Sequence, residues 1–450
     1  MVEKDPYEQL YAQFRWQCPG EFSIAEACCA RWARETPDAP AVIFEGPTGC
    51  RAQYSFGQLQ RAANRLANAL RRMGIVAGTR VAILLPQRFE AIAAHIAINR
   101  LGAVALPVPL QLSGPVQAAR LRAGEARVAI VDCAALAGLR KARPQCPDLC
   151  HLILVGECPA EGDEIPWMQA VQAEDARFEP VPLQAEAPAL LLDGKAESGG
   201  GTLLPQRALI GHLSGFVASQ NWFGFDPAAP QATSRAVFWT ASDWAGSAAL
   251  LDGVLPALYF GRPVLAWQGR FDASRVLDLM RRHCVSHTLL SGAVLDALVA
   301  TSSTQRGGVM LEGIAADVGE LGGATLEAAR NAFGVPVNTV FARAGIGAFV
   351  GHCTRFWDTQ PGSLGRAYPG HRVAVIDAAG EPCPPGVVGE LALHRRDVHG
   401  DPDPIFFLPA STHGAGRAHG DWWRSGARAL QDEAGVFWRQ GGANAEQLTH

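Results

Sequence analysis

Three consecutive glycines follow a short apolar run near the middle of the chain. The run, residues 189–192, has the composition of a buried strand, and it leads into the glycine-rich segment. Glycine lets backbone N–H groups turn towards a polyanion without a side chain in the way, and flanking hydroxyls could donate further hydrogen bonds. The pattern predicts a phosphate-cradling loop, although an ordinary flexible turn fits the same residues. The loop residues are Ser198, Gly199, Gly200, Gly201 and Thr202.

Other catalytic motifs do not match the sequence. Lys195 follows a glycine but precedes Ala196, whereas a P-loop needs Ser or Thr after its lysine. There is no G-x-S-x-G nucleophile motif. His212 and Ser214 fall on a predicted helix, where a core or surface role is more frequent than catalysis. The glycine-rich loop therefore remains the main candidate for chemistry.

Residues 198–206 resemble the phosphate loop of the adenylate-forming superfamily, the acyl-CoA synthetases and their relatives. The pattern there is Thr-Ser-Gly-Thr-Thr-Gly-x-Pro-Lys, and with Pro205 aligned, Gly200 and Thr202 match it. Gln206 stands at the lysine of the pattern. A neutral amide donor forms a hydrogen bond about half as strong as a charge-assisted one, so the resemblance implies a weakened phosphate site.

The resemblance extends to two further motifs, both of which lack their carboxylate here. The family's Tyr-Gly-x-Thr-Glu corresponds to residues 341–345, where Phe341 keeps an aromatic plate for adenine and Ala342 follows, but the magnesium-holding Glu is gone. The family's Thr-Gly-Asp, whose Asp binds the ribose hydroxyls, corresponds to residues 425–427 and ends in Ala427. The resemblance therefore implies a nucleotide site without its acidic ligands.

Two tryptophans and an aspartate mark the region where the resemblance implies an acyl pocket. They are Trp239, Asp243 and Trp244, on a strand, turn and helix similar to those of small- and medium-chain acyl-CoA synthetases. Both tryptophans could also be plain core aromatics, since that is the more frequent position of a buried tryptophan.

Together these departures predict a catalytically degenerate protein similar to acyl-CoA synthetases. In that family a carboxylic acid attacks the α-phosphate of ATP to give an acyl-adenylate and pyrophosphate, and coenzyme A then takes the acyl group. With the ionic groups replaced, we expect weak binding of ATP or AMP and no use of magnesium or coenzyme A. The chain could still hold a small carboxylic acid, an acyl group or a nucleotide, or pair with an active synthetase or an acyl carrier protein.

Two alternatives stay open. The first is an active AMP-forming carboxylic acid–CoA ligase that uses substitute residues such as Lys195 and Glu320. The second is a structural subunit that packs on a partner through the aromatic N-terminal arm.

The elements that must position these residues alternate between strands and helices. Apolar strands separated by helices of crossover length predict an α/β fold with a parallel sheet. The resemblance implies two parallel or mixed β-sheet subdomains, and the later hairpins are similar to the family's small β-barrel. Ser23 has the position of an N-cap residue. Predicted strands include residues 41–44, 128–131, 151–155, 373–377 and 389–394, and predicted helices include 89–101 and 248–259.

The domain boundaries follow from these patterns and from the resemblance. We expect an N-terminal arm at residues 1–20, a first α/β subdomain at 21–185, a second with the degenerate loop at 186–365, a small β-barrel at 366–442, and a truncated hinge at 443–450 with the family's C-terminal domain absent.

Composition excludes some classes of partner. Of 450 residues, 48% are hydrophobic and 18% charged, and the net charge of −4 gives no attraction to nucleic acid. No apolar run reaches the roughly 18 residues that a membrane span needs. The N-terminus has no hydrophobic signal core, which favours a cytoplasmic protein.

The 11 cysteines form no disulfide-framework spacing, so we expect reduced thiols. Two clusters could ligate a metal, but the first lacks a C-x-x-C pair and both have the polar composition of surface loops, so we expect none. They are Cys146, Cys150, His151 and Cys158, and the acidic and histidine residues of 394–404.

Overall fold

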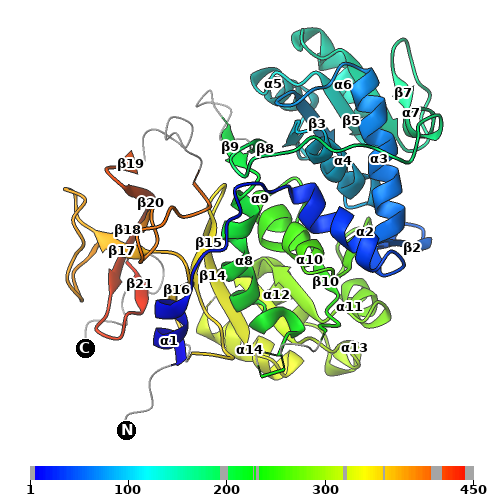
Figure 1. Ribbon diagram of the computed structural model, residues 1–450. Coiled ribbons are helices and arrows are strands. Elements are labelled where there is room, and N and C mark those ends of the chain that lie inside the picture. Colours follow the sequence, from blue (N-terminus) through cyan, green and yellow to red (C-terminus); the bar gives the residue numbers. More distant parts are fainter. Residues whose placement is uncertain are drawn as a thin grey trace.

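The computed structural model describes residues 6–192, 201–226, 228–229, 233–317, 322–357, 360–406 and 418–440. These residues form a mixed α/β fold with two large sheets and a smaller antiparallel sheet, which confirms the predicted fold class (Figure 1). None of the described helices is both long and apolar enough to cross a bilayer.

The first large sheet has seven strands in the order β7-β6-β5-β3-β4-β8-β9. Its strands pair in parallel except at β8 and β9, which are antiparallel on either side of the glycine-rich segment. The strands are β3 (Arg80–Leu84), β4 (Val104–Pro107), β5 (Val128–Asp132), β6 (His151–Val155), β7 (Ile165–Pro166), β8 (Pro188–Leu192) and β9 (Thr202–Pro205). The helices between them are α3 (Phe56–Arg72), α4 (Phe89–Arg100), α5 (Gly114–Ala123), α6 (Cys133–Ala142), η2 (Arg143–Gln145) and α7 (Trp167–Gln172).

The second large sheet has nine strands in the order β16-β15-β14-β13-β12-β10-β11-β1-β2. The strands are β1 (Pro40–Glu45), β2 (Arg51–Ser55), β10 (Phe238–Thr240), β11 (Val264–Trp267), β12 (His287–Leu290), β13 (Gly313–Asp317), β14 (Val337–Arg343), β15 (Gly347–Gly351) and β16 (Arg366–Ala367). Its helices are η1 (Glu26–Ala30), α2 (Arg31–Glu35), α8 (Ala208–Ser219), η4 (Asn221–Gly224), α9 (Ser247–Ala249), η5 (Leu250–Val254), α10 (Leu255–Tyr259), α11 (Ala273–Arg282), α12 (Gly292–Val299), α13 (Ser303–Arg306) and α14 (Gly323–Phe333).

The two sheets exchange strands across the boundary expected at residue 185. β1 and β2 precede that boundary, yet β1 pairs in parallel with β11 of the second sheet. β8 follows the boundary, yet it pairs with β4 of the first sheet. The largest buried cluster contains residues of α3, α4, α8 and α10 together with strands of both sheets, so the core lies between the sheets.

The third sheet is antiparallel and comprises β17 (Val373–Ile376), β18 (Gly389–His394), β19 (Ala418–His419), β20 (Trp422–Gln431) and β21 (Phe437–Arg439). The N-terminal segment lies against the chain just before this sheet, starting with α1 (Pro6–Gln13) (Figure 1). The side chains of Tyr7, Tyr11 and Trp16 donate hydrogen bonds to the backbone carbonyls of residues 367, 371 and 370. These bonds fix the segment on the body of the protein.

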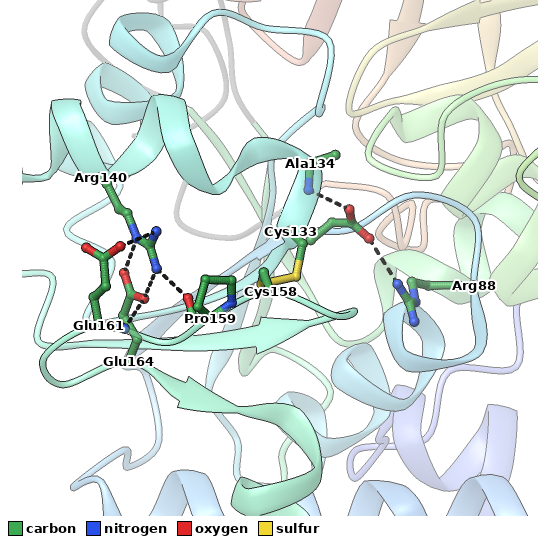
Figure 2. The surroundings of a disulfide bond; sticks show 9 residues. Arg88, Cys133, Ala134, Arg140, Cys158, Pro159, Glu161 and Glu164 are labelled. Atoms are coloured by element: carbon green, nitrogen blue, oxygen red, sulfur yellow. Dashed lines mark hydrogen bonds and ion pairs between the residues drawn. A yellow bond between two sulfur atoms is a disulfide. The ribbon is translucent and has the colours of Figure 1, made fainter.

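A disulfide joins Cys133 and Cys158, so the prediction of reduced thiols is wrong for this pair (Figure 2). β5 and β6 are neighbouring parallel strands, and both cysteines follow the carboxyl ends of these strands, with their Cα atoms 5.8 Å apart. Sequence spacing could not reveal this, because the cysteines are 25 residues apart and only strand pairing brings them together. Cys158 is therefore not available as a ligand in the cluster with Cys146, Cys150 and His151, where we expected no metal, and the described residues contain no group of three potential metal ligands.

We expect the Cys133→Ser variant to unfold with a free energy about 3 kcal/mol lower than the wild type under non-reducing conditions. The disulfide closes a loop of 25 residues, and cross-linking a loop of that length removes this much chain entropy from the unfolded state. Denaturant unfolding with and without a reductant measures the difference. Cys150→Ser removes an exposed free thiol, keeps the disulfide and serves as the control. The reductant should lower the unfolding free energy of the control but not that of Cys133→Ser, and an equal change in both variants would contradict the bond.

Candidate functional site

The flank of the glycine-rich loop lies against the segment expected to bind adenine. Thr202 begins β9, and Gly345 lies in the turn between β14 and β15 with φ of +77°. A Cβ atom added to Gly345 would lie 3.1 Å from the Thr202 methyl carbon, so the two segments are in close contact. A Cβ atom added to Gly201 would lie 2.7 Å from the Leu192 carbonyl oxygen, which explains the glycine there. Ser198, Gly199 and Gly200 lie outside the described residues.

An arginine connects the adenine segment to the segment expected to bind ribose. Arg343 donates from Nε to the carbonyl oxygen of Ser425 at 3.0 Å, and its guanidinium carbon lies 4.2 Å from the centre of the Phe341 ring. Three segments that are far apart in the sequence therefore meet in one place. This convergence is the arrangement that the sequence resemblance implies.

The Phe341 ring is buried and packs against other side chains of the protein. Its side chain is only 2% exposed, its ring packs edge-to-face on Phe349 with centres 5.4 Å apart, and Arg343 covers it. In this conformation no base can stack on the Phe341 ring. Ala342 beside it is half-buried, on the same strand.

Gln206 has its side chain in the core and not at the surface of the loop. Its exposed fraction is 0%. Its Oε1 accepts a hydrogen bond from the Ile24 N–H at 2.8 Å, and its Nε2 donates to Asn99 Oδ1 at 2.8 Å. The amide that replaces the family's lysine therefore ties α4 to the chain entering η1.

Two carboxylates near the ribose segment, Asp432 in sequence and Glu390 in space, are engaged in hydrogen bonds. Asp432 accepts hydrogen bonds from the Val436 N–H at 2.9 Å and from Trp438 Nε1 at 2.8 Å. Glu390 accepts from the Gly426 N–H at 2.8 Å and from Arg424 at 3.0 Å. Sequence reasoning missed Glu390, because only the pairing of β18 with β20 brings it to Gly426.

The described residues of the three segments supply no carboxylate for a magnesium ion, and Glu390 beside them is paired with Arg424. Magnesium is bound through carboxylate, phosphate and water oxygens. The described segments 201–206, 341–345 and 425–427 contain no carboxylate, and their charged side chain is the cation of Arg343. No step through magnesium is therefore derived for this chain.

The structure separates the predicted acyl-pocket residues. Trp239 is 1% exposed and packs edge-to-face on Trp267, in the core beneath β10 and β11. Asp243 accepts from the Ala245 N–H at 3.0 Å, and burial raises the pKa of its carboxyl group. Trp244 lines a small apolar cavity between elements of both sheets, next to Ile83, His95 and Leu250. The cavity volume of ≈ 10 Å³ is about that of one water molecule.

A profile of the AMP-binding enzyme family matches residues 29–399. The chain belongs to this family. Among curated relatives, it is 22% identical over 407 residues to an uncharacterised acyl–CoA ligase of Bacillus subtilis, covering 88% of this chain and 72% of the relative. It is 24% identical over 444 residues to a human mitochondrial acyl-coenzyme A synthetase, covering 95% of this chain and 73% of the relative.

Among solved structures, an acyl-CoA synthetase of Brucella canis has a TM-score of 0.85 with 21% identity, over 98% of this chain and 80% of that chain. At this identity the likeness shows the fold. The membership in the AMP-binding family and the fold confirm the resemblance drawn from the loop and strand pattern. The contacts of Phe341, Arg343 and Gln206 are features of this chain within that family fold.

His95, which sequence reasoning also missed, makes stability depend on pH. It is buried on α4, its Nδ1 has no hydrogen-bond partner among the described residues, and burial lowers its pKa from 6.5 to about 4. The unfolded chain therefore binds a proton at His95 more readily than the folded chain does. The contribution of the neutral, buried imidazole to the free energy of unfolding is complete above about pH 6.5 and is lost as pH falls towards 4. We expect His95→Gln to lose roughly 2 kcal/mol less than the wild type between about pH 7 and 5. Urea titrations at the two pH values measure the unfolding free energy of both proteins. An equal drop in the wild type and in His95→Gln would contradict this.

Proposed function

We propose that this chain is a member of the AMP-binding enzyme family that does not form acyl-adenylates. It instead binds a small carboxylic acid, an acyl group or a nucleotide, or acts as the partner of an active synthetase or acyl carrier protein. The observation that carries the proposal is Arg343, which lies over Phe341 and donates to the Ser425 carbonyl, where the segments expected to bind adenine and ribose meet.

The electrostatic argument concerns the transition state of adenylation. That reaction builds charge on the phosphates, and the family's lysine and carboxylates with their magnesium stabilise it. Here Gln206 and Ala427 are neutral, and the Gln206 amide is engaged in the core. If each lost contact removes about 3 kcal/mol, each slows the reaction roughly a hundredfold, so several losses together leave a negligible rate.

Arg343 also supports a class of ligand. Two of its N–H groups already donate to the carbonyl oxygens of Ser425 and Ala342, so the class follows from its positive charge, which attracts a carboxylate or a phosphate without a metal ion. A carboxylic acid or AMP carries such a group, and two relatives of this chain are named an acyl–CoA ligase and an acyl-coenzyme A synthetase. The proposal includes no use of coenzyme A.

A thermal-shift series with ATP, AMP, coenzyme A and short, medium and aromatic carboxylates tests the proposal. A ligand that binds only the folded chain raises the melting temperature by mass action. We expect a carboxylate or AMP to raise it to the same extent with and without magnesium, and Arg343→Gln to abolish the rise. Each acid is also incubated with ATP, magnesium and hydroxylamine, which traps an acyl-adenylate. Hydroxamate formation would overturn the proposal and favour the alternative of an active ligase that uses Lys195 or Glu320, which both lie outside the described residues.

A further inference from the structure

A polar cavity lies at the opposite end of β14 from the nucleotide segments. Its volume is ≈ 310 Å³, and it opens at the amino ends of the parallel strands β12, β13 and β14, with His287, Glu312 and Pro336 in its wall. Asn221, Gly224, Thr354 and Arg355 complete the lining. β14 has seven residues, so about 20 Å of strand separates this cavity from residue 343.

The wall on the side of η4 is built from backbone in an unusual conformation. Asn221, Trp222 and Phe223 have φ of 49°, 71° and 49°, and Gly224 follows with 72°. Left-handed backbone costs about 1–2 kcal/mol for each residue that has a Cβ atom, so three in succession need support from their surroundings.

Side chains from β14 and from the segment after β15 supply that support. Asn221 Oδ1 accepts hydrogen bonds from Asn338 Nδ2 at 2.8 Å and from Thr354 Oγ1 at 3.2 Å. The Trp222 ring lies 4.0 Å from the ring of Phe356. With Oδ1 occupied in this way, the Asn221 amide is held in one orientation at the cavity wall.

His287 provides a buried polar group in the same wall. It is 1% exposed, and Nε2 has no hydrogen-bond partner in the part of the chain that the structure describes. Nδ1 lies 2.8 Å from the Ser286 hydroxyl, which already accepts from the Val237 N–H. We assign the hydroxyl proton to Nδ1, so the neutral imidazole carries its own proton on Nε2 as a donor. Burial lowers the pKa of His287 to about 4, which keeps the ring neutral near neutral pH.

Opposite charges lie on the rim of the cavity. Arg355 donates to the Phe225 carbonyl at 3.0 Å and to Asp226 at 3.3 Å, and the side chains of this pair are 38% and 50% exposed. An ion pair so exposed is weak, so the remaining N–H groups of Arg355 can bind a ligand carboxylate. Glu312 is exposed at the start of β13 and offers carboxylate oxygens to an ammonium group.

We propose that this cavity binds a small zwitterion of the α-amino acid type, with its carboxylate on Arg355 and its ammonium on Glu312. The cavity of ≈ 310 Å³ has room for a ligand of this size. The site is separate from the segments around Arg343, so it goes beyond the proposed function.

Isothermal titration of the full chain with glycine, serine and glutamine tests the site, with acetate and methylammonium as ligands of one charge. We expect at least one of the amino acids to bind more tightly than either singly charged ligand. Arg355→Gln and Glu312→Gln should each weaken binding about tenfold or more, since each removes a charge-assisted hydrogen bond. Arg270→Gln and Glu433→Gln, exposed side chains outside the cavity, are matched controls and should bind as the wild type does.

Three outcomes would overturn this inference. In the first, none of the three amino acids binds. In the second, acetate or methylammonium binds as tightly as the amino acids do. In the third, the Arg355→Gln and Glu312→Gln variants both bind as tightly as the wild type. Circular dichroism and the melting temperature verify that the variants fold, and Arg355→Lys, which keeps the charge, should retain part of the affinity. Because neither variant touches Arg343, the response to AMP and carboxylates should persist in both, so failure here is distinct from failure of the proposed function.

Discussion

Replacing Gln206 by alanine is expected to lower the free energy of unfolding by about 4 kcal/mol. The change leaves the Ile24 N–H and Asn99 Oδ1 without their partner in a position that is 0% exposed. Each buried polar group left unpaired costs about 1–3 kcal/mol, and the lost side-chain volume adds a cavity. Denaturant unfolding measures the loss. Gln172→Ala, at the exposed end of α7, is the control and should change little.

The Gln206→Lys variant tests the same contact from the side of function. It restores the residue of the family pattern, but it places an ammonium group at a buried position. The Asn99 Oδ1 atom could accept one hydrogen bond from this group, while the Ile24 N–H on the other side is a donor and could accept none. We therefore expect a destabilised protein without gain in ATP binding. A variant of native stability that binds ATP more tightly would mean that the side chain at position 206 reaches the phosphate loop.

Replacing Asp403 by alanine is expected to cost about 3–5 kcal/mol of unfolding free energy. Asp403 and His371 are both 0% exposed, and Asp403 Oδ2 lies 2.7 Å from His371 Nδ1, while Oδ1 accepts from the Ile405 N–H at 3.1 Å. Removing Asp403 leaves the buried His371 Nδ1 and the Ile405 N–H without their acceptor, each of which costs about 1–3 kcal/mol, and the lost side-chain volume adds a cavity.

The neighbouring Asp401 provides the control for this measurement. It lies exposed two residues away, so Asp401→Ala should change the unfolding free energy by less than about 0.5 kcal/mol. Asp403→Asn, which keeps the shape, should fall between the two. Equal stability of Asp403→Ala and Asp401→Ala would contradict a structural role for the buried carboxylate.

The 394–404 segment carries histidine and aspartate residues of the types that ligate metals, although we expected no metal there. Histidine and aspartate spacing cannot tell a ligand from a turn-forming side chain. In the structure, Asp397 accepts from the backbone N–H groups of residues 399 and 401, and Asp403 binds His371, which lies 32 residues earlier in the sequence. These carboxylates serve the local backbone and the core.

The strands and helices themselves could be predicted, because apolar periodicity is local. The expected helix at 248–259 appears as α9, η5 and α10, and the expected strands at 128–131 and 151–155 appear as β5 and β6. The Ser23 hydroxyl accepts from the Glu26 N–H at 3.4 Å, which confirms it as a cap at the start of the helical segment.

The remaining features could not be predicted, because they depend on contacts between residues distant in sequence. β1 (Pro40–Glu45) pairs with β11 (Val264–Trp267), although most of the second sheet's sequence range lies between them. The disulfide depends on β5 and β6 being neighbours. The motif comparison placed Gln206 at the family's lysine without showing that its amide points into the core. Motif reasoning thus located the segments of the candidate site, but the directions of its side chains came from packing.

The most direct test of the proposed loss of adenylation is acid-dependent exchange of labelled pyrophosphate into ATP. The exchange reports formation and reversal of the acyl-adenylate and does not require coenzyme A. We expect no exchange above the acid-free background with short, medium or aromatic acids, while an active acyl-CoA synthetase assayed in parallel exchanges readily. Exchange by this chain that requires both magnesium and one of the acids would contradict the account.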